Sequence, residues 1–413
     1  MIQEVIALKK RFDIIALSCL LALCTGCVST VPKAEDAEVP TEAATEPETE
    51  PVTEPQLTVP EKKLASMSLE EKVCQMFIVT PEQFSDDTLV TVYDDLIDEG
   101  IAGYPAGGVI LFAQNLETQE QTKELLSALQ EKSFDTCGIG MFTSIDEEGG
   151  SVARAAEKLG TTAFSPMSYY GAEGDTQQAY EIGHTLGTDL RSLGFNLDFA
   201  PVADVLVSPD NELGDRIFSD DPQVVSEMVS NMVIGLQDSG VCATLKHFPG
   251  LGAASGNTHE DSAVYVSRTP EELRETEFVP FREGAAAGAS FVMVGHQIME
   301  CTGEDVPSDL SKTVITDWLR GEIGFDGIVI TDSQQMNTIA YVYTPGEAAV
   351  TSIKAGADII LMPADYRAAV EDVIQAVKDG DISQERIDES VMRILEKKYE
   401  LGLIDENSVK EAE

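Results

Sequence analysis

The sequence predicts an α/β fold, a (β/α)₈ barrel of the TIM type formed by a single domain. Short apolar runs bounded by Gly or Pro recur along the chain, which is typical of strands buried in a parallel sheet. The runs lie at residues 76–79, 108–112, 139–145, 197–202, 243–245, 291–294, 328–331 and 359–362. Eight strands alternating with helices are the number that closes such a barrel. A doubly wound open sheet is the competing architecture, and the lack of a GxGxxG motif after the first strand argues against it.

The segments between these runs carry the start and stop signals of helices. A Ser or Thr followed three residues later by Glu or Gln fits a capping box, in which each residue hydrogen-bonds the backbone of the other. Such pairs are Ser68 and Glu71, Thr118 and Gln121, and Thr269 and Glu272, the last with Pro270 at the first helical position. Glycines that favour helix ends stand where helices should stop, at Gly194, Gly240 and Gly380.

Residues 1–27 resemble a bacterial export signal rather than part of the fold. Three basic residues precede an apolar segment, residues 14–24, that is too short to span a bilayer comfortably. The following Leu23-Cys24-Thr25-Gly26-Cys27 resembles a lipobox, the motif at which a signal peptide is cleaved and a cysteine acylated, although Cys24 stands where Leu is usual. We therefore expect Cys27 to carry a lipid anchor. The protein would then be exported and held at the cell membrane, facing outside the cytoplasm.

Residues 28–63 are dominated by Pro, Glu and Thr and contain few apolar side chains. Such a segment cannot bury enough surface to order itself, so we expect an extended acidic tether, with the barrel in residues 64–413. The formal net charge of the chain is −46. This charge argues against binding nucleic acid, which needs Lys and Arg, and against binding an anionic membrane surface other than through the anchor.

Polar side chains follow the predicted strands at the points where a barrel collects its chemistry, the C-terminal strand ends. These residues are Asp146 and Arg154 after the third run, Arg216 after the fourth, Lys246 and His247 after the fifth, and Asp332 after the seventh. Charged groups are costly to bury without partners, so their clustering at one face predicts a polar pocket. Each alone would be more ordinary as a cap or a surface ion pair.

A glycine-rich loop follows the fifth run and carries a further histidine. Residues 246–259 read KHFPGLGAASGNTH, which is too flexible for a core element and too rich in special residues for a plain connector. The chain has four histidines, and His247 and His259 both fall here. A basic pair at a strand end, a mobile loop and a histidine able to fold back indicate a catalytic loop.

The residue types at these positions limit the chemistry. The histidines are scattered without an HExxH motif, and neither GxSxG nor a P-loop occurs, so we expect no metal and no cofactor. Acid/base and nucleophilic work by carboxylates and imidazole remains. This combination suits sugars, because a carboxylate can attack the anomeric carbon while an acid protonates the leaving oxygen.

Six motifs stand in one order along the chain: GGVILF at 107–112, DEEGGSVAR at 146–154, NLDFAPVADV at 196–205, DRIFSDDP at 215–222, KHFPGLG at 246–252 and GIVITDSQQM at 327–336. Together they resemble glycoside hydrolase family 3, and in particular its single-barrel β-N-acetylhexosaminidase branch. The resemblance extends from about Leu64 to Leu403. It implies one catalytic barrel.

The resemblance also implies a role for each matching residue. Asp332 matches the nucleophile that forms a glycosyl-enzyme, and His259 matches the loop histidine that serves as acid/base. The residues that match sugar-binding positions are Asp146, Arg154, Arg216, Lys246 and His247. A helix cap is the alternative role for Asp332, and an exposed loop residue is the alternative for His259.

The loop departs from the family pattern at Asn257, where this branch usually has Asp. That Asp would hydrogen-bond the imidazole and stabilise its protonated form, whereas Asn257 can orient the ring but supplies no charge. We expect a weaker acid step and a working pH range shifted toward acid, with Glu260 or Asp261 as possible substitutes for the carboxylate. Asn257→Asp should then raise turnover near neutral pH, and an unchanged rate would contradict this. Leu251 is a smaller departure, where His is usual.

The leading interpretation is a lipid-anchored, exo-acting, retaining β-N-acetylglucosaminidase, expected to be a monomer, that acts on peptidoglycan fragments or chitin-type oligosaccharides. A β-glucosidase or β-xylosidase of the same family is an alternative, although these usually carry a second domain that supplies the acid/base. A catalytically weakened sugar-binding lipoprotein is another, because of Asn257. The sequence does not choose between hydrolysis and phosphorolysis.

Overall fold

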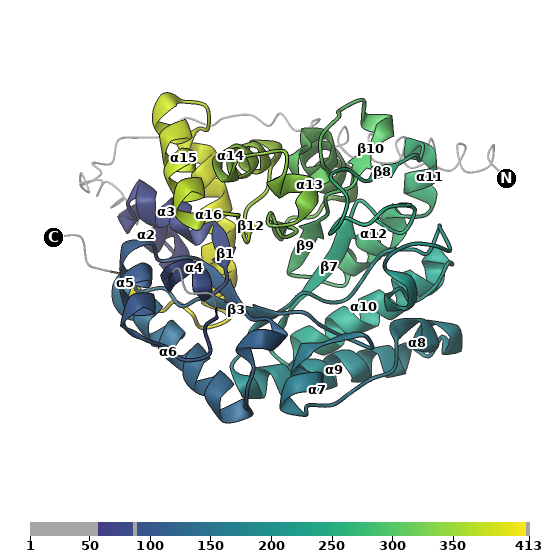
Figure 1. Cartoon of the computed structure of the whole chain (residues 1–413), viewed down its shortest axis with the longest axis horizontal. Coiled ribbons are helices and arrows are strands. Elements are labelled where there is room, and N and C mark those ends of the chain that lie inside the picture. Colours follow the sequence, from purple (N-terminus) through teal and green to yellow (C-terminus); the bar gives the residue numbers. More distant parts are fainter. Residues whose placement is uncertain (1–56, 86–88, 410–413) are drawn as a thin grey trace, which may run out of the picture. The chain divides into compact units, whose positions relative to one another are not determined.

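The computed structural model describes residues 57–85 and 89–409, and its centre is a sheet of eight parallel strands enclosed by helices (Figure 1). Neighbouring strands follow the order β11-β9-β7-β6-β3-β2-β1-β12. Their bounds are β1 (Phe77–Val79), β2 (Gly108–Ile110), β3 (Phe142–Ile145), β6 (Leu197–Asp198), β7 (Cys242–Phe248), β9 (Phe291–Val294), β11 (Ile328–Thr331) and β12 (Ile360–Leu361).

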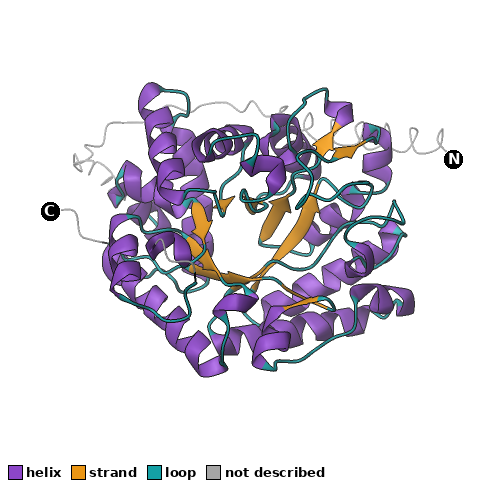
Figure 2. Ribbon diagram, viewed as in Figure 1, coloured by secondary structure: helices purple, strands orange, loops and turns teal. Residues whose placement is uncertain are grey.

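The two ends of this sheet meet. Ile330 of β11 forms a bridge with Ile359 just before β12, and the backbone N–H of Leu361 donates to the Thr331 hydroxyl at 3.0 Å. On the other side, β12 pairs with β1 through Phe77 and Ile360. The strands therefore form a ring with helices outside it, as Figure 2 shows. The predicted (β/α)₈ barrel is confirmed.

The helices form an outer layer around the strands. Their bounds are α2 (Val59–Ser66), α3 (Leu69–Gln75), α4 (Glu82–Ser85), α5 (Asp95–Gly103), α6 (Gln119–Cys137), α7 (Arg154–Leu159), α8 (Met167–Glu173), α9 (Thr176–Leu193), α10 (Pro222–Asp238), α11 (Pro270–Glu275), α12 (Phe278–Ala286), the π-helix η5 (Thr313–Ile323), α13 (Asn337–Ala340), α14 (Pro345–Ala355), α15 (Tyr366–Asp379) and α16 (Gln384–Glu400). Two small sheets lie in the loops, β4 (Glu147–Gly149) with β5 (Val152–Ala153), and β8 (Tyr265–Val266) with β10 (Ile298–Met299).

The helices begin where the sequence signals predicted. Both halves of a capping box form at Ser68 with Glu71 and at Thr269 with Glu272. Thr118 caps α6, but the side chain of its partner Gln121 turns to the backbone of Glu117 instead. Left-handed glycines end α9 and α15, at Gly194 and Gly380.

Helix α2 begins before the point at which we expected the tether to end. Thr58 and Glu61 form a capping box and Pro60 stands in the first turn, so residues 59–63 are helical. The ammonium group of Lys63 then donates to the backbone oxygens of Cys137 and Ser408, at 2.5 and 3.0 Å, which ties α2 to the barrel. The predicted signal and lipobox, and residues 28–56 of the predicted tether, lie outside the described residues. Within the part of the chain that the structure describes, no helix is both long and apolar enough to cross a bilayer.

Strand β7 is longer than its apolar run predicted. It continues from Cys242 to Phe248, so Lys246 and His247 lie on the strand itself rather than after its end. The apolar run ends at these two polar residues, so the run predicts a strand that is shorter than β7. The pairing of β7 with β9 shifts register between Leu245 and Phe248, which places the basic pair at an irregular strand end.

Candidate active site

The seven residues predicted to act on substrate line a single cavity at the C-terminal ends of the strands. The cavity has a volume of about 180 Å³. The seven residues are Asp146, Arg154, Arg216, Lys246, His247, His259 and Asp332. They come from the ends of four barrel strands, β3, β6, β7 and β11, and from the loop after β7, so only closure of the barrel brings them together.

Two carboxylates share the ammonium group of Lys246. Its Nζ lies 2.9 Å from Asp146 Oδ1 and 2.6 Å from Glu148 Oε1. Arg216 makes two hydrogen bonds of 2.7 Å to Glu148, and a guanidinium nitrogen of Arg154 lies 3.2 Å from Asp146. Bidentate charge-assisted bonds of this kind fix both partners in place. The five side chains therefore form one connected network.

The network holds Glu148 and Lys246 in their charged forms. Burial alone would raise the pKa of Glu148, but Lys246 and Arg216 lower it to about 2. Burial opposes the charge of Lys246 as well, and Asp146 and Glu148 raise its pKa above the usual value. Glu148 is 2% exposed, whereas the Asp146 and Arg154 side chains are 17% and 23% exposed. The Arg216 side chain is 20% exposed, so Asp146, Arg154 and Arg216 are the members that can reach a ligand in the cavity.

Glu147 and Glu148 are adjacent in sequence but serve different purposes. Because they alternate on β4, Glu148 joins the cavity while Glu147 turns to the start of α7. Glu147 accepts hydrogen bonds from the backbone N–H groups of Ala155 and Ala156, at 2.6 and 3.0 Å. Burial raises its pKa to about 7. Glu147 thus anchors the helix whose first residue, Arg154, contacts Asp146.

Asp204 fixes His247 and the beginning of the catalytic loop. One of its carboxylate oxygens lies 2.8 Å from His247 Nδ1 and accepts the His247 backbone N–H at 3.0 Å. The other accepts the N–H of Leu251 at 2.6 Å. Asp204 is fully buried, so His247 is oriented by a carboxylate that the solvent does not reach. The free Nε2 side of His247 is left for the cavity.

Asp332 follows β11 directly and lines the cavity beside His247. Its backbone N–H donates to Val294 of β9 at 2.9 Å, and its Oδ1 accepts the backbone N–H of Ser333 at 2.7 Å. Burial would raise its pKa, but His296 and then His247 lower it below the ordinary value. Asp332 is therefore an ionised, half-buried carboxylate, and the ionised form is the one required of a nucleophile.

His296 is doubly protonated. Its Nδ1 lies 3.0 Å from Asp309 Oδ1 and its Nε2 lies 2.9 Å from the backbone oxygen of Ser333. A carbonyl oxygen can only accept, and Asp309 is a carboxylate, so both ring nitrogens must donate. Burial lowers the pKa of His296, and Asp309 outweighs burial to raise it to about 9. A fixed positive charge therefore stands behind Asp332.

The loop after β7 brings His259 to the rim of the cavity. The Asn257 side-chain oxygen accepts the backbone N–H of His259 at 2.9 Å, so Asn257 shapes the turn rather than contacting the imidazole. Asp261 accepts the backbone N–H of Asn257. Glu212 of the β6–α10 loop accepts both the N–H and the hydroxyl of Thr258, at 3.1 and 3.0 Å. Glu212, which lies outside this loop, therefore holds the loop in place at Thr258, next to His259.

Sequence reasoning missed three functional carboxylates. Glu148 stands next to Glu147 within the motif at 146–154, and alternation on a short strand is the signal that separates the two. Glu212 lies in an irregular loop with no local pattern, and Asp309 lies far from the nucleophile in sequence. Among the described residues, no group of three or more His, Cys, Asp or Glu side chains is arranged to hold a metal ion.

The site combines an ionised carboxylate, a loop imidazole and a charged network open to hydroxyl groups. This set can attack an anomeric carbon from one residue, protonate a leaving oxygen from another and grip the ring with the rest.

Comparisons with known proteins identify the family of the chain and some of its relatives. Residues 68–397 match the family described as the glycosyl hydrolase family 3 N-terminal domain. The beta-hexosaminidase A of Pseudoalteromonas piscicida is 31% identical over 74% of this chain and 55% of its own length. The beta-hexosaminidase of Xylella fastidiosa strain M23 is 35% identical over 69% of this chain and 82% of its own length.

A solved structure shows the same architecture. The family 3 β-N-acetylglucosaminidase from Paenibacillus sp. str. FPU-7 superposes with a TM-score of 0.77 at 36% identity, covering 82% of this chain and 63% of the other. The chain thus spans a little over half the length of the Pseudoalteromonas protein and about two thirds of the length of the Paenibacillus protein. The family match, which covers most of the barrel, shows that this chain belongs to glycoside hydrolase family 3.

Proposed function

We propose that this glycoside hydrolase is a retaining, exo-acting β-N-acetylglucosaminidase that removes terminal N-acetylglucosamine from chitin-type oligosaccharides or peptidoglycan fragments. The names of its relatives support the sugar, since the similar proteins above are a beta-hexosaminidase A, a beta-hexosaminidase and a β-N-acetylglucosaminidase. The small cavity supports an exo mode of action, because it has room for a terminal ring and not for an extended chain.

The observation that carries the proposal is the pair of Asp332 and His259 in one cavity, with Asp332 held ionised. In the first step Asp332 attacks the anomeric carbon while His259 gives a proton to the departing glycosidic oxygen. A covalent glycosyl-enzyme forms as that C–O bond breaks. In the second step water attacks the same carbon, His259 takes a proton from the water, and Asp332 is released.

The network on the other side of the cavity binds the ring. Asp146, Arg154 and Arg216 are the partly exposed members, so they contact the sugar hydroxyls. Lys246 and His247 line the inner wall. Arg216 acts through Glu148 and also reaches the cavity. Because every charge in this set is paired before substrate arrives, the sugar meets groups that are already oriented.

The test is turnover of an aryl β-N-acetylglucosaminide by the purified chain, with the aryl β-glucoside as the comparison substrate. We expect turnover of the first substrate only, and a loss of at least ~10³-fold in Asp332→Ala with an unchanged melting temperature. Equal turnover of the glucoside would favour a β-glucosidase. If no turnover occurs from acid to neutral pH but N-acetylglucosamine raises the melting temperature, the chain is a sugar-binding protein instead.

We further propose that the protein is exported and anchored by lipid at Cys27, as its N-terminal sequence indicates. The intact chain should partition into the detergent phase when membranes are solubilised. The variant Cys27→Ala should leave the anchor unattached, and an unchanged partition of this variant would contradict the assignment.

A further inference from the structure

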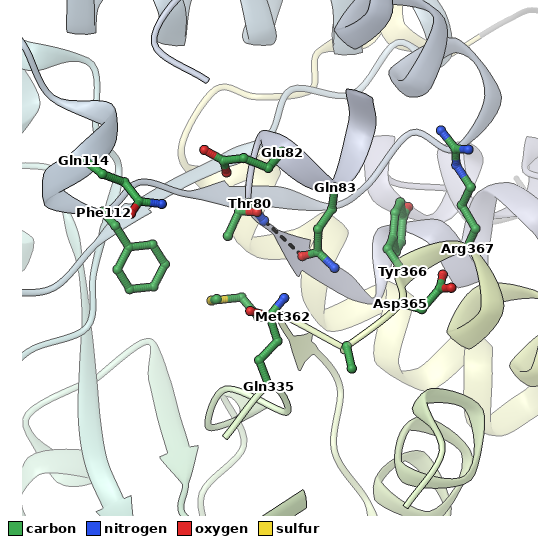
Figure 3. Close-up of a pocket in the computed structure, with 11 residues that line it drawn as sticks. Thr80, Glu82, Gln83, Phe112, Gln114, Gln335, Met362, Asp365, Tyr366 and Arg367 are labelled. Carbon is green, nitrogen blue, oxygen red and sulfur yellow. Dashed lines mark hydrogen bonds between the residues drawn. The ribbon is translucent and has the colours of Figure 1, made fainter. Parts of the chain in front are cut away.

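A second cavity, larger than the catalytic one, lies next to it at the same end of the barrel. Its volume is about 620 Å³, and its walls come from the ends of β1, β2 and β12 and from the loop after β11. Figure 3 shows side chains from these segments around a common open space. No residue predicted from the sequence to act on substrate lines this cavity.

The two cavities share walls. Phe112 and Met362 line both of them. Phe112 also carries the guanidinium group of Arg154 over its ring, 4.9 Å from the centroid. Gln335 lines the second cavity and lies three residues after Asp332, in the loop that starts with the nucleophile. A molecule bound at Asp332 thus has this cavity as a neighbour.

The backbone conformation of Met362 supports a ligand-binding role for the wall that the two cavities share. It is the one non-glycine residue with a positive φ in the described part of the chain, at 48°. A long side chain in the left-handed region costs free energy, and such strain concentrates at ligand sites. Met362 is nonetheless buried, and its backbone N–H is fixed to Ile78 of β1 at 2.8 Å. The fold therefore keeps an apolar side chain between the cavities at a cost.

The polar groups of the second cavity divide into two kinds. The side chains of Glu82 and Gln83 already have hydrogen-bond partners. Glu82 accepts from the backbone N–H of Val90 and the side-chain amide of Asn115. Gln83 accepts from the backbone N–H of Thr80 and donates to the backbone oxygen of Pro363. The side-chain amides of Gln114 and Gln335, both exposed, form no hydrogen bond within the described residues. An amide offers two donors and an acceptor, which suits hydroxyl and acetamide groups.

We propose that this second cavity binds the leaving part of the substrate as an uncharged N-acetylhexosamine ring. The ring would contact Phe112 and Met362 through its C–H face and the amides of Gln114 and Gln335 through its polar edge. This rests on the proposed function, because the terminal sugar must occupy the catalytic cavity first. If the second cavity binds such a ring, the substrates are chitin-type oligosaccharides rather than peptidoglycan fragments.

The charged residues of the second cavity disfavour the binding of a sugar ring that carries a carboxylate. The charged residues of the second cavity are Glu82, Asp365 and Arg367, so carboxylates outnumber cations. The chain as a whole has a formal net charge of −46. A muramic-type ring, which carries a lactyl carboxylate, would enter against both the local and the overall field.

The experiment compares three substrates of the purified full chain. They are an aryl β-N-acetylglucosaminide, the chitin disaccharide, and a disaccharide whose second ring carries a lactyl carboxylate. The variants are Gln335→Ala and Gln114→Ala. The matched control is Gln384→Ala, because Gln384 is an exposed glutamine at the start of α16 that lines neither cavity.

For each cavity variant we expect kcat/KM for the chitin disaccharide to fall about five- to tenfold more than kcat/KM for the aryl substrate, the loss typical of one hydrogen bond. The control should change neither value. The wild type should prefer the chitin disaccharide over the acidic one. Equal losses on both substrates, or a preference for the acidic disaccharide, would overturn the proposal.

Failure of the proposed function gives a different result. If the wild type turns over none of the three substrates, the catalytic assignment is wrong, and binding then tests the cavity by itself. Titration of Asp332→Ala with the chitin disaccharide should show affinity that falls when Gln335→Ala is added. Unchanged affinity in that double variant would reject the second cavity independently of catalysis.

Discussion

At the scale of single residues, the charge on His296 favours the ionised form of Asp332, the proposed nucleophile. The imidazolium is enclosed by Asp309 and Ser333 and acts on Asp332 across a buried space. His247 and Lys246 also lower the pKa of Asp332. Because His296 is the largest of these influences, its removal should raise the pKa of Asp332 toward or above the ordinary value.

We therefore predict that His296→Gln moves the acid limb of the kcat/KM profile to higher pH by about one unit, the effect of ~1.4 kcal/mol of lost stabilisation. The sign follows because a raised pKa protonates Asp332 at a higher pH. The measurement is a pH series with an aryl glycoside. His184→Gln is the matched control, since His184 is exposed on α9 and stacks on Tyr180. An acid limb that does not move would show that His296 only supports the structure.

At the scale of elements, the β6–α10 loop holds the catalytic loop in place. Asn211 donates to the backbone oxygens of Leu251 and Ala254, at 2.8 and 3.1 Å, and Glu212 accepts from Thr258. These bonds attach the loop at its beginning and next to His259. The stability of the loop therefore depends on a second loop more than on its own glycine-rich sequence.

We predict that Glu212→Ala lowers kcat about tenfold, because the loss of two hydrogen bonds leaves His259 at the cavity for a smaller fraction of the time. Glu212→Gln should recover most of the rate, since an amide oxygen can still accept from Thr258. Steady-state kinetics of the two variants test this. If Glu212→Gln is as slow as Glu212→Ala, the negative charge of Glu212 matters and the acceptor does not.

The strands and loops differ in how well the sequence predicts their bounds and their site residues. Strands β9 and β11 have the predicted bounds, because their apolar runs end at Gly or polar residues that also end the strand. Strand β7 was predicted too short, because Lys246 and His247 break the apolar run while the backbone continues. Six of the seven cavity residues could be placed from the ends of predicted strands, and His259 from the glycine-rich loop that follows β7. Glu212 and Asp309 could not, because they contact the site through loops whose path is set by packing.

At the scale of the whole molecule, the distribution of charge favours neutral ligands. The chain has 73 acidic and 27 basic residues, yet Arg154, Arg216 and Lys246 meet at the catalytic cavity. Asp146 and Glu148 pair with all three of these cations, and Asp332 adds a third carboxylate to the cavity. The site therefore presents oriented hydrogen-bonding groups rather than a net positive field. A sugar without charge is the ligand that such a site admits at least cost.

The opposite end of the barrel contains a lysine that has no carboxylate partner among the described residues, and this lysine links the stability of the fold to pH. Lys398 is fully buried and donates to Gln75 Oε1 at 2.7 Å and to the backbone oxygen of Gly107 at 2.8 Å, with its Nζ 5.0 Å from the centre of the Phe142 ring. Burial lowers its pKa to about 7. A neutral amine keeps two N–H donors, so both hydrogen bonds survive loss of the proton.

In the unfolded chain Lys398 stays protonated up to its ordinary value of 10.5, so between pH 7 and 10.5 the unfolded state binds more protons. The free energy of unfolding contributed by this residue must therefore rise with pH across that window, by up to ~5 kcal/mol. We predict that the difference in unfolding free energy between wild type and Lys398→Met grows in favour of the wild type from pH 7 to 9.5. Denaturant titrations at several pH values measure it, and taking the difference cancels groups that titrate in both proteins. A difference that stays constant over this range would mean that Lys398 keeps its proton in the folded barrel, held by its two carbonyl partners and the ring of Phe142.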